Sequence, residues 1–330
     1  MHSGRASARG SPNEDQTRRR HRLLRLQGRA KLSGRPFTFW RVLPLIGEPA
    51  SSYFSRLVID ECNHLPEMYA SEVGVDTIFK SEELLERIFR LPISEADKER
   101  LRHWTPVERN GRIFLAGQTF RRNEFRWARR LECRHCIAEV PYHRVWWHLE
   151  FFRMCPVHQC SLEPIRHGQR SIGRWWPRYS HAASERLPHV ELGDGEDTLE
   201  SYVIRHLINR DGHSSEREVG DFIETAEVVG RLIGNPRQPT VPPFSKADLD
   251  LGYRVLNGGP SSIIEHFRAW MQANPPPPFA YRIRDLAGWA DEYLLSQDRN
   301  LDPEVDDVAN QLLLDVADII RVECERVLGR

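Results

Sequence analysis

The sequence predicts a mainly α-helical protein in which a small cysteine-rich module separates an N-terminal helix-turn-helix-like segment from a C-terminal helical domain. Apolar residues recur at helical spacing along much of the chain. Four of the six cysteines lie between Leu131 and Cys160. Charge is also divided: His181 to Arg330 carries 27 acidic and 15 basic side chains, whereas the preceding residues carry 20 acidic and 32 basic.

Length and composition allow several domains. The chain has 330 residues, of which 40% are hydrophobic, enough for two or three separate cores. We expect a disordered basic tail at 1–35, a helical domain at 36–120, the cysteine module at 121–180 and an acidic helical domain at 181–330. No stretch approaches the roughly 18 apolar residues that span a membrane, and the N-terminus lacks an apolar secretory segment. We therefore expect a cytoplasmic protein with no membrane partner.

The first 35 residues are rich in Arg, Ser and Gly, and include "TRRRHRLLRLQGRAK" from Thr17 to Lys31. Such a composition favours disorder, and its basic charge could bind phosphates. The alternative is that translation starts further downstream and that this segment has no role.

The next stretch suggests two short helices. "SSYFSRLVIDECNH" begins with Ser51 or Ser52 as an N-cap, and "PEMYASEVGV" places Pro66 at a first helical position. The apolar face of the first helix consists of Tyr53, Phe54, Leu57, Val58 and Cys62. The pair is typical of a helix-turn-helix. An ordinary helical hairpin used for packing is the alternative. "SEELLERIFRLPIS" predicts a further helix that ends at Pro92.

A basic and aromatic segment, "FRRNEFRWARR", runs from Phe120 to Arg130. Interleaved arginines and rings can bind a nucleic-acid backbone and cover its bases. The candidate DNA-binding residues are Arg121, Arg122, Arg126, Arg129 and Arg130. The alternative is that the rings pack into the cysteine module while the arginines stay solvated.

The acidic half reads as a series of amphipathic helices. They are "DTLESYVIRHLINR", "SEREVGDFIETAEVVGRLIG" and "SIIEHFRAWM", followed by a stiff linker at Asn274 to Phe279. The last helix is expected to start after Asp302, with an apolar face of Val305, Val308, Leu312, Val316, Ile319 and Ile320. This stripe could support a homodimer or form part of the intramolecular core.

The cysteine spacing predicts a zinc site. Cys133 and Cys136 are separated by two residues, and so are Cys155 and His158. Two such knuckles bring three thiolates and one imidazole to a single tetrahedral centre, as in zinc ribbons. The other nearby donors are His135, His143, His148, His167 and Cys160. Four protein ligands leave no vacant position, which is typical of structural zinc.

A catalytic zinc is the alternative, because Glu139 could serve as a base. However, the sequence has no HExxH or comparable array, which makes a zinc hydrolase or nuclease the weaker hypothesis. Between the knuckles, Trp147 and Phe151 are expected to form the small core that zinc alone does not provide.

These segments resemble the TniQ family of transposition target-selection proteins. "PLIGEPASSYFSRL", from Pro44 to Leu57, matches the family's Pro-containing lead and the helix opened by paired serines. The two knuckles, the Pro-Tyr-x-Arg-x-x-Trp core at Pro141 to Trp147 and Leu162 follow in the family's order. "ESYVIRHL", "AEVVGRLIG" and "GYRVLNGGPSSIIEHF" extend the resemblance to Phe267.

One feature departs from the family pattern. Many relatives carry a second Cys-x-x-Cys pair after the His knuckle, but residues 161–180 contain no cysteine here. We therefore expect one zinc site, with Trp175 and Trp176 filling the space as hydrophobic core.

The resemblance implies a non-catalytic adaptor of the bacterial cytoplasm that helps to select the target site. It would recognise target DNA directly or through a CRISPR effector complex and recruit a AAA+ transposition ATPase, which then engages the transposase. The basic half would face DNA and the acidic half a protein. A stand-alone zinc-containing DNA-binding regulator, acting without an ATPase, is the alternative.

Overall fold

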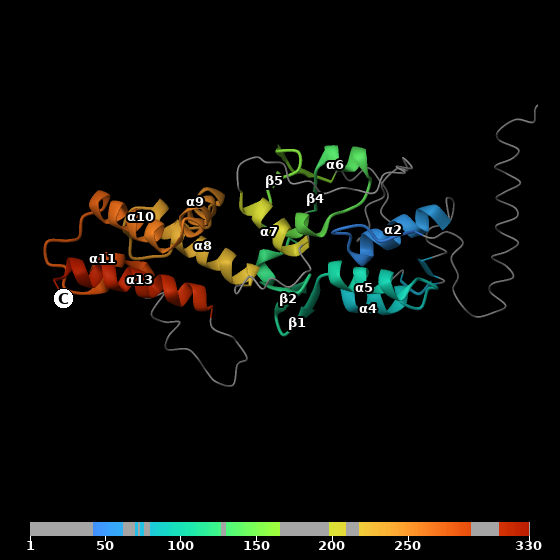
Figure 1. Ribbon diagram of the computed structural model, residues 1–330, viewed down its shortest axis with the longest axis horizontal. Helices are drawn as coiled ribbons and strands as arrows, with labels where there is room; N and C mark the ends of the chain where they lie inside the picture. The colour runs from blue at the N-terminus through green and yellow to red at the C-terminus, as the bar shows by residue number, and fades with distance from the viewer. Residues whose placement is uncertain are drawn as a thin grey trace, which may run out of the picture. The chain divides into compact units, whose positions relative to one another are not determined.

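The computed structural model (Figure 1) describes residues 42–61, 70–71, 73–75, 80–126, 130–165, 198–208, 218–291 and 310–329. These residues are mainly helical with a few short strands, which confirms the predicted fold class. They divide into two compact units. The first holds the described residues up to Pro44 and from Ala50 to Arg102; the second holds Leu45–Pro49 and the described residues from His103 onward.

The first unit is built from α2 (Ala50–Glu61), α4 (Ser81–Ile88) and most of α5 (Glu95–Trp104). The predicted apolar face of α2 is confirmed at four buried positions: Tyr53, Phe54, Leu57 and Val58. α2 packs against α4, which buries Leu84, Leu85 and Ile88 and ends at Ile88, before the expected stop at Pro92. Residues 62–69, with Cys62 and Pro66, lie outside the described residues, so the helix-turn-helix remains a prediction.

The second unit opens with a three-stranded antiparallel sheet in the order β1 (Val107–Arg109), β2 (Arg112–Leu115) and β3 (Gln118–Arg121). Both connections are two-residue hairpin turns in which each residue has a positive φ: Asn110 and Gly111, then Ala116 and Gly117. These strands lie within 36–120, the range expected to form a helical domain, and that division of the chain stays a prediction. Asn-Gly between two short β-compatible runs is the signal that the helical interpretation overlooked.

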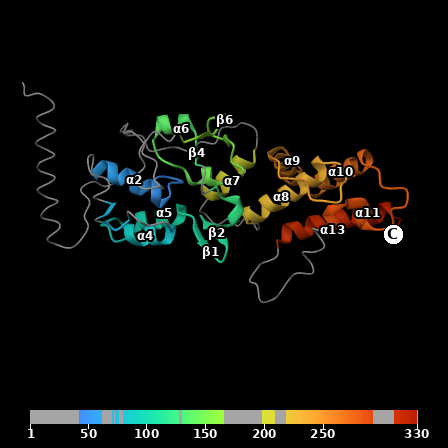
Figure 2. The ribbon, with the colours of Figure 1, turned by 180° about the vertical axis from the view of Figure 1, so that it is seen from behind.

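After the cysteine knuckles, the described part of the second unit contains the helices α7 (Leu199–Ile208), α8 (Val219–Gly234), α9 (Lys246–Asn257), α10 (Gly259–Ala273), α11 (Ile283–Ala287) and α13 (Gln311–Val327). α8 is their centre, because it contacts α9, α13 and strand β3. Figures 1 and 2 show α8 beside α13 from both sides. The predicted start of the last helix after Asp302 was wrong: Asn310, in extended conformation, caps α13 and accepts from the Leu313 N–H.

Helices α8 and α9 approach each other so closely at two positions that only glycine fits. A Cβ on Gly252 of α9 would lie 1.8 Å from the Ala226 carbonyl oxygen of α8. A Cβ on Gly230 would lie 1.7 Å from the Asp248 carbonyl oxygen. These glycines let the backbones of α8 and α9 touch, which accounts for their close packing.

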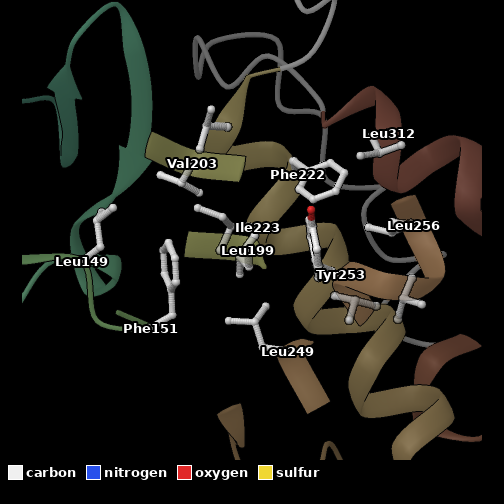
Figure 3. Close-up of a cluster of buried hydrophobic side chains, with 14 of the residues drawn as sticks. Leu149, Phe151, Leu199, Val203, Phe222, Ile223, Leu249, Tyr253, Leu256 and Leu312 are labelled. Carbon is white, nitrogen blue, oxygen red and sulfur yellow. The ribbon is translucent and has the colours of Figure 1, made fainter. Parts of the chain in front are cut away.

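One hydrophobic core runs through the second unit. Figure 3 shows Leu149 and Phe151, from the segment between the cysteine knuckles, beside Leu199 of α7, and Phe222 of α8 beside Tyr253 of α9. Leu312 of α13 belongs to the same core. The expected domain limits at 120 and 180 remain predictions, and the second lies outside the described residues. Among the described helices, none is both long and apolar enough to cross a membrane.

Candidate metal centre and arginine clusters

The first knuckle is formed where a short strand meets a short helix. β4 (Leu131–Glu132) leads into α6 (Arg134–Glu139), and Cys133 is the N-cap between them. The Cys133 Sγ accepts from the Cys136 N–H at 3.5 Å, so the helix turn itself brings the two sulfurs together. Both cysteines are buried.

The second knuckle is a β-hairpin. β5 (Met154–Cys155) pairs with β6 (Cys160–Ser161), and Cys155 lies opposite Cys160. The turn between them contains His158 and closes with Gln159 at a φ of 49° and a bond from its N–H to the Cys155 carbonyl. β7 (Glu163–Pro164) returns to pair with β4, which ties the two knuckles into one module.

The four predicted ligands come together. One donor atom from each of Cys133, Cys136, Cys155 and His158 lies within 4.8 Å of every other. The Cys136 and Cys155 sulfurs are 3.6 Å apart, and the His158 Nδ1 lies 3.6, 3.3 and 3.7 Å from the sulfurs of Cys133, Cys136 and Cys155.

These separations are the edges of a metal-sized tetrahedron. Zn–S bonds of about 2.3 Å and a Zn–N bond of about 2.0 Å give S···S edges of roughly 3.8 Å and S···N edges of roughly 3.6 Å. The observed distances agree with both values to within a few tenths of an ångström. The cluster can therefore hold a metal ion, and its soft donor set is consistent with zinc.

The remaining donors near the centre have other surroundings. Cys160 Sγ lies 3.5 Å from Cys133 Sγ, but Cys160 is not one of the four mutually close ligands. His143 and His148 are buried against each other, with ring centroids 4.6 Å apart. His135 stacks on His158. His167 lies outside the described residues.

The thiols interact electrostatically with one another. Hydrogen bonds from the Cys136 and Cys155 thiols lower the pKa of Cys133, and donation to Cys133 raises the pKa of both donors. The nearby Arg144 guanidinium opposes the rise at Cys136. These hydrogen bonds favour the thiolate at Cys133 over those at Cys136 and Cys155.

Aromatic residues support the module, as predicted for Trp147 and Phe151, which are both buried. The 3₁₀-helix η2 (Val145–His148) carries Trp146 against the Leu45–Pro49 segment. A Cβ on Gly47 would lie 2.0 Å from the Trp146 ring, and the Val145 N–H donates to the Gly47 carbonyl. The Leu45–Pro49 segment and η2, which are about a hundred residues apart in sequence, therefore pack against each other.

Arg121 is engaged inside the second unit. Its guanidinium bonds Glu124 of the 3₁₀-helix η1 (Arg122–Glu124) at 3.1 Å and Glu224 of α8 at 3.0 Å, and it pairs with Glu227 at 3.5 Å. The three carboxylates join strand β3 to helix α8. DNA contact by Arg121 remains a prediction, but this arginine also has a role within the fold.

The other four candidates differ in exposure. Arg126 is buried and bonds both the carboxylate and the carbonyl of Glu150. Arg122 exposes 70% of its side chain and pairs with Glu108 at 3.3 Å. Arg130 is half-buried, and its carbonyl accepts from the Ile165 N–H. Arg129 lies outside the described residues.

Sequence reasoning did not pick out two further arginines. Arg109 lies opposite Arg112 and Arg112 lies opposite Arg121 in the sheet register, so all three occupy one face. Phe114, two residues after Arg112 on the same face, exposes 43% of its surface. Predicting this row of three arginines from the sequence requires the register of the hairpin, which the Asn110-Gly111 turn indicates.

Comparison with known proteins gives one match. Residues 39–162 match the model of the TniQ family, a non-catalytic accessory domain family associated with transposition. No curated protein and no solved structure matches the chain. The matched region contains the Leu45–Pro49 segment, the sheet and all four members of the metal cluster. Over these residues, the chain is similar to the TniQ family.

Proposed function

We propose that this protein is a non-catalytic transposition accessory protein that helps to select the target site and recruits a AAA+ transposition ATPase. The observation that carries the proposal is the TniQ match, with a complete Cys₃His cluster inside it. The transposase would be engaged indirectly, through the ATPase. The target would be read on DNA or through a CRISPR effector complex.

A structural zinc ion is part of this proposal. Cys133, Cys136, Cys155 and His158 would hold it, and four protein donors at tetrahedral spacing leave no position for a substrate. Zinc with three thiolates carries one net negative charge, which the buried Arg144 beside Cys136 would offset. The ion would fix the two knuckles and hence the aromatic core between them.

The accessible face of the β1–β2–β3 sheet is our candidate DNA contact. Arg109 and Arg112 lie next to exposed Phe114, and guanidinium groups beside a ring suit phosphate binding and base stacking. Arg121 closes the row but is held by the carboxylates of η1 and α8. Exposed Arg122 is the member of the original candidates best placed to bind phosphate without disturbing the core.

Transposition with and without the protein tests the role. The ATPase, the transposase and a donor element from the same transposon would be combined with plasmid target DNA, and insertions would be mapped by sequencing. We expect omission of the protein to reduce insertion or to scatter its positions. Unchanged insertion frequency and positions would refute the adaptor role, and co-purification with the ATPase would separate it from a stand-alone regulator.

DNA contact is tested separately by binding at two salt concentrations. Arg109→Glu and Arg122→Glu should weaken binding and reduce its salt dependence, because each removes a phosphate partner. Arg321→Glu makes the same change in net charge at a partly exposed position of α13 and serves as the control for net charge. Equal affinity and salt slope for the wild type and both arginine variants would contradict this choice of surface.

A further inference from the structure

The His158 imidazole is held at both nitrogens. Its Nδ1 faces the sulfurs of Cys133, Cys136 and Cys155 at 3.3–3.7 Å. Its Nε2 lies 2.9 Å from the Glu139 Oε1. If the ring binds a metal through Nδ1, Nε2 must carry the proton, and a carboxylate at this distance accepts it.

A second group of the same helix touches the ring. His135 stacks on His158 with ring centroids 5.5 Å apart and an interplanar angle of 27°. His135 and Glu139 are four residues apart on α6, so they lie on the same helix side, next to the ligand Cys136. Helix α6 therefore supplies one metal ligand and two contacts to another.

We propose that Glu139 and His135 are positioning residues that hold His158 as an Nδ1 metal ligand. The proposal rests on the zinc site proposed above. Glu139 fixes the tautomer by accepting the Nε2 proton and makes the coordinating nitrogen more basic. His135 limits rotation of the ring about its bond to Cβ.

Positioning matters here because the centre offers competing donors. The imidazole could otherwise turn to present Nε2, and the Cys160 thiol lies only 3.5 Å from Cys133 Sγ. A fixed His158 keeps the Cys₃His set and leaves Cys160 out of the coordination sphere. This gives Glu139 a role that requires no open metal position, unlike the general base of a zinc hydrolase.

The test measures zinc affinity of the full-length protein by competition with a chromophoric zinc chelator at fixed pH. We expect Glu139→Ala to weaken zinc binding 10- to 100-fold, the usual effect of removing such a partner. Glu139→Gln should lose less, because its amide oxygen still accepts the proton. The Glu139 side chain is 63% exposed, so neither change opens the core. Glu163→Gln, in the same module, is the matched control.

Nitrogen-15 NMR of labelled histidine gives a readout independent of affinity. In the zinc-loaded wild type, the His158 signals should show a metal-bound Nδ1 and a protonated Nε2. His135→Ala should broaden or divide these signals, whereas His135→Phe, which retains a stacking ring, should restore them.

The outcomes distinguish a failure of the positioning role from a failure of the zinc site on which it rests. A wild-type protein that binds no stoichiometric zinc would refute the zinc site itself. A wild type that binds zinc while Glu139→Ala binds equally well, with the same His158 tautomer, would overturn the positioning role alone. Nε2 coordination in the wild type would also overturn it.

Discussion

Replacing Gly252 by alanine tests the packing of α8 against α9. The new methyl would lie 1.8 Å from the Ala226 carbonyl oxygen and 2.8 Å from the Gly230 nitrogen. Both are backbone atoms of α8, so no side-chain rotation relieves the overlap. Ordinary contacts of a Cβ begin at 3.4 Å, so the two backbones must move apart by roughly 1.5 Å at this point.

The size of the effect follows from two opposing terms. Overpacking a close contact costs about 1–3 kcal/mol, and backbone overlap belongs at the upper end. Alanine in a helix interior recovers roughly 1 kcal/mol relative to glycine. We therefore expect Gly252→Ala to lower the free energy of local opening of α8 and α9 by about 2 kcal/mol.

Gly234→Ala is the matched control on the same helix pair. Its methyl would meet the Asp248 Oδ1 at 2.4 Å, a carboxylate that can rotate away. This variant should be neutral or slightly stabilised, because only the helix-propensity term remains.

Hydrogen–deuterium exchange of the α8 and α9 amides is the assay, since it reports local opening without assuming a two-state transition. A loss of about 2 kcal/mol corresponds to roughly 30-fold faster exchange in Gly252→Ala. Zinc content should be unchanged, which would localise the damage. Equal protection in Gly252→Ala and Gly234→Ala would refute the close approach of the two backbones.

Two further predictions concern the module. Burial lowers the pKa of His148 to about 4. Between about pH 6.5 and pH 4, His148 is therefore protonated in the unfolded chain but neutral in the folded protein. As the pH drops through this range, the free energy of unfolding falls by up to roughly 3 kcal/mol. His148→Asn keeps a donor for the Arg126 carbonyl, and its denaturation midpoints at pH 5 and pH 7 should differ less than those of the wild type; an equal difference would contradict the assignment. Cys136→Ser should abolish stoichiometric zinc binding measured by metal analysis, whereas Cys160→Ser should retain it, and loss of zinc in both would show that Cys160 is a ligand.

The metal cluster was predictable because its information is local. Each knuckle is a Cys-x-x-Cys or Cys-x-x-His segment whose own turn brings two donors together, so spacing alone indicates the four donors that form the cluster. The buried face of α2 was predictable for the same reason, since helical periodicity needs no distant partner. The role of Glu139 toward His158 was not, because it depends on the packing of α6 against the hairpin turn.

The arginines show where local information ends. Arg121 and Arg126 belong to a basic segment that is typical of a nucleic-acid contact, yet one bonds Glu224 about a hundred residues away and the other is buried against Glu150. Whether an arginine is solvated depends on which carboxylates the fold brings to it. The β1–β2–β3 sheet was a different kind of miss, because Asn110-Gly111 does carry a local hairpin signal that helical expectations concealed.

The Leu45–Pro49 segment makes the second unit discontinuous in sequence. Gly47 packs on the Trp146 ring of the second unit. The next residues, Ala50–Arg102, belong to the first unit, and the second unit resumes at His103. A fragment that starts at His103 would therefore lack its own cover over the Trp146 ring and the acceptors for Val145 and Tyr142. We therefore expect that a separately expressed metal module must include Leu45–Pro49 as well as the residues from His103 onward.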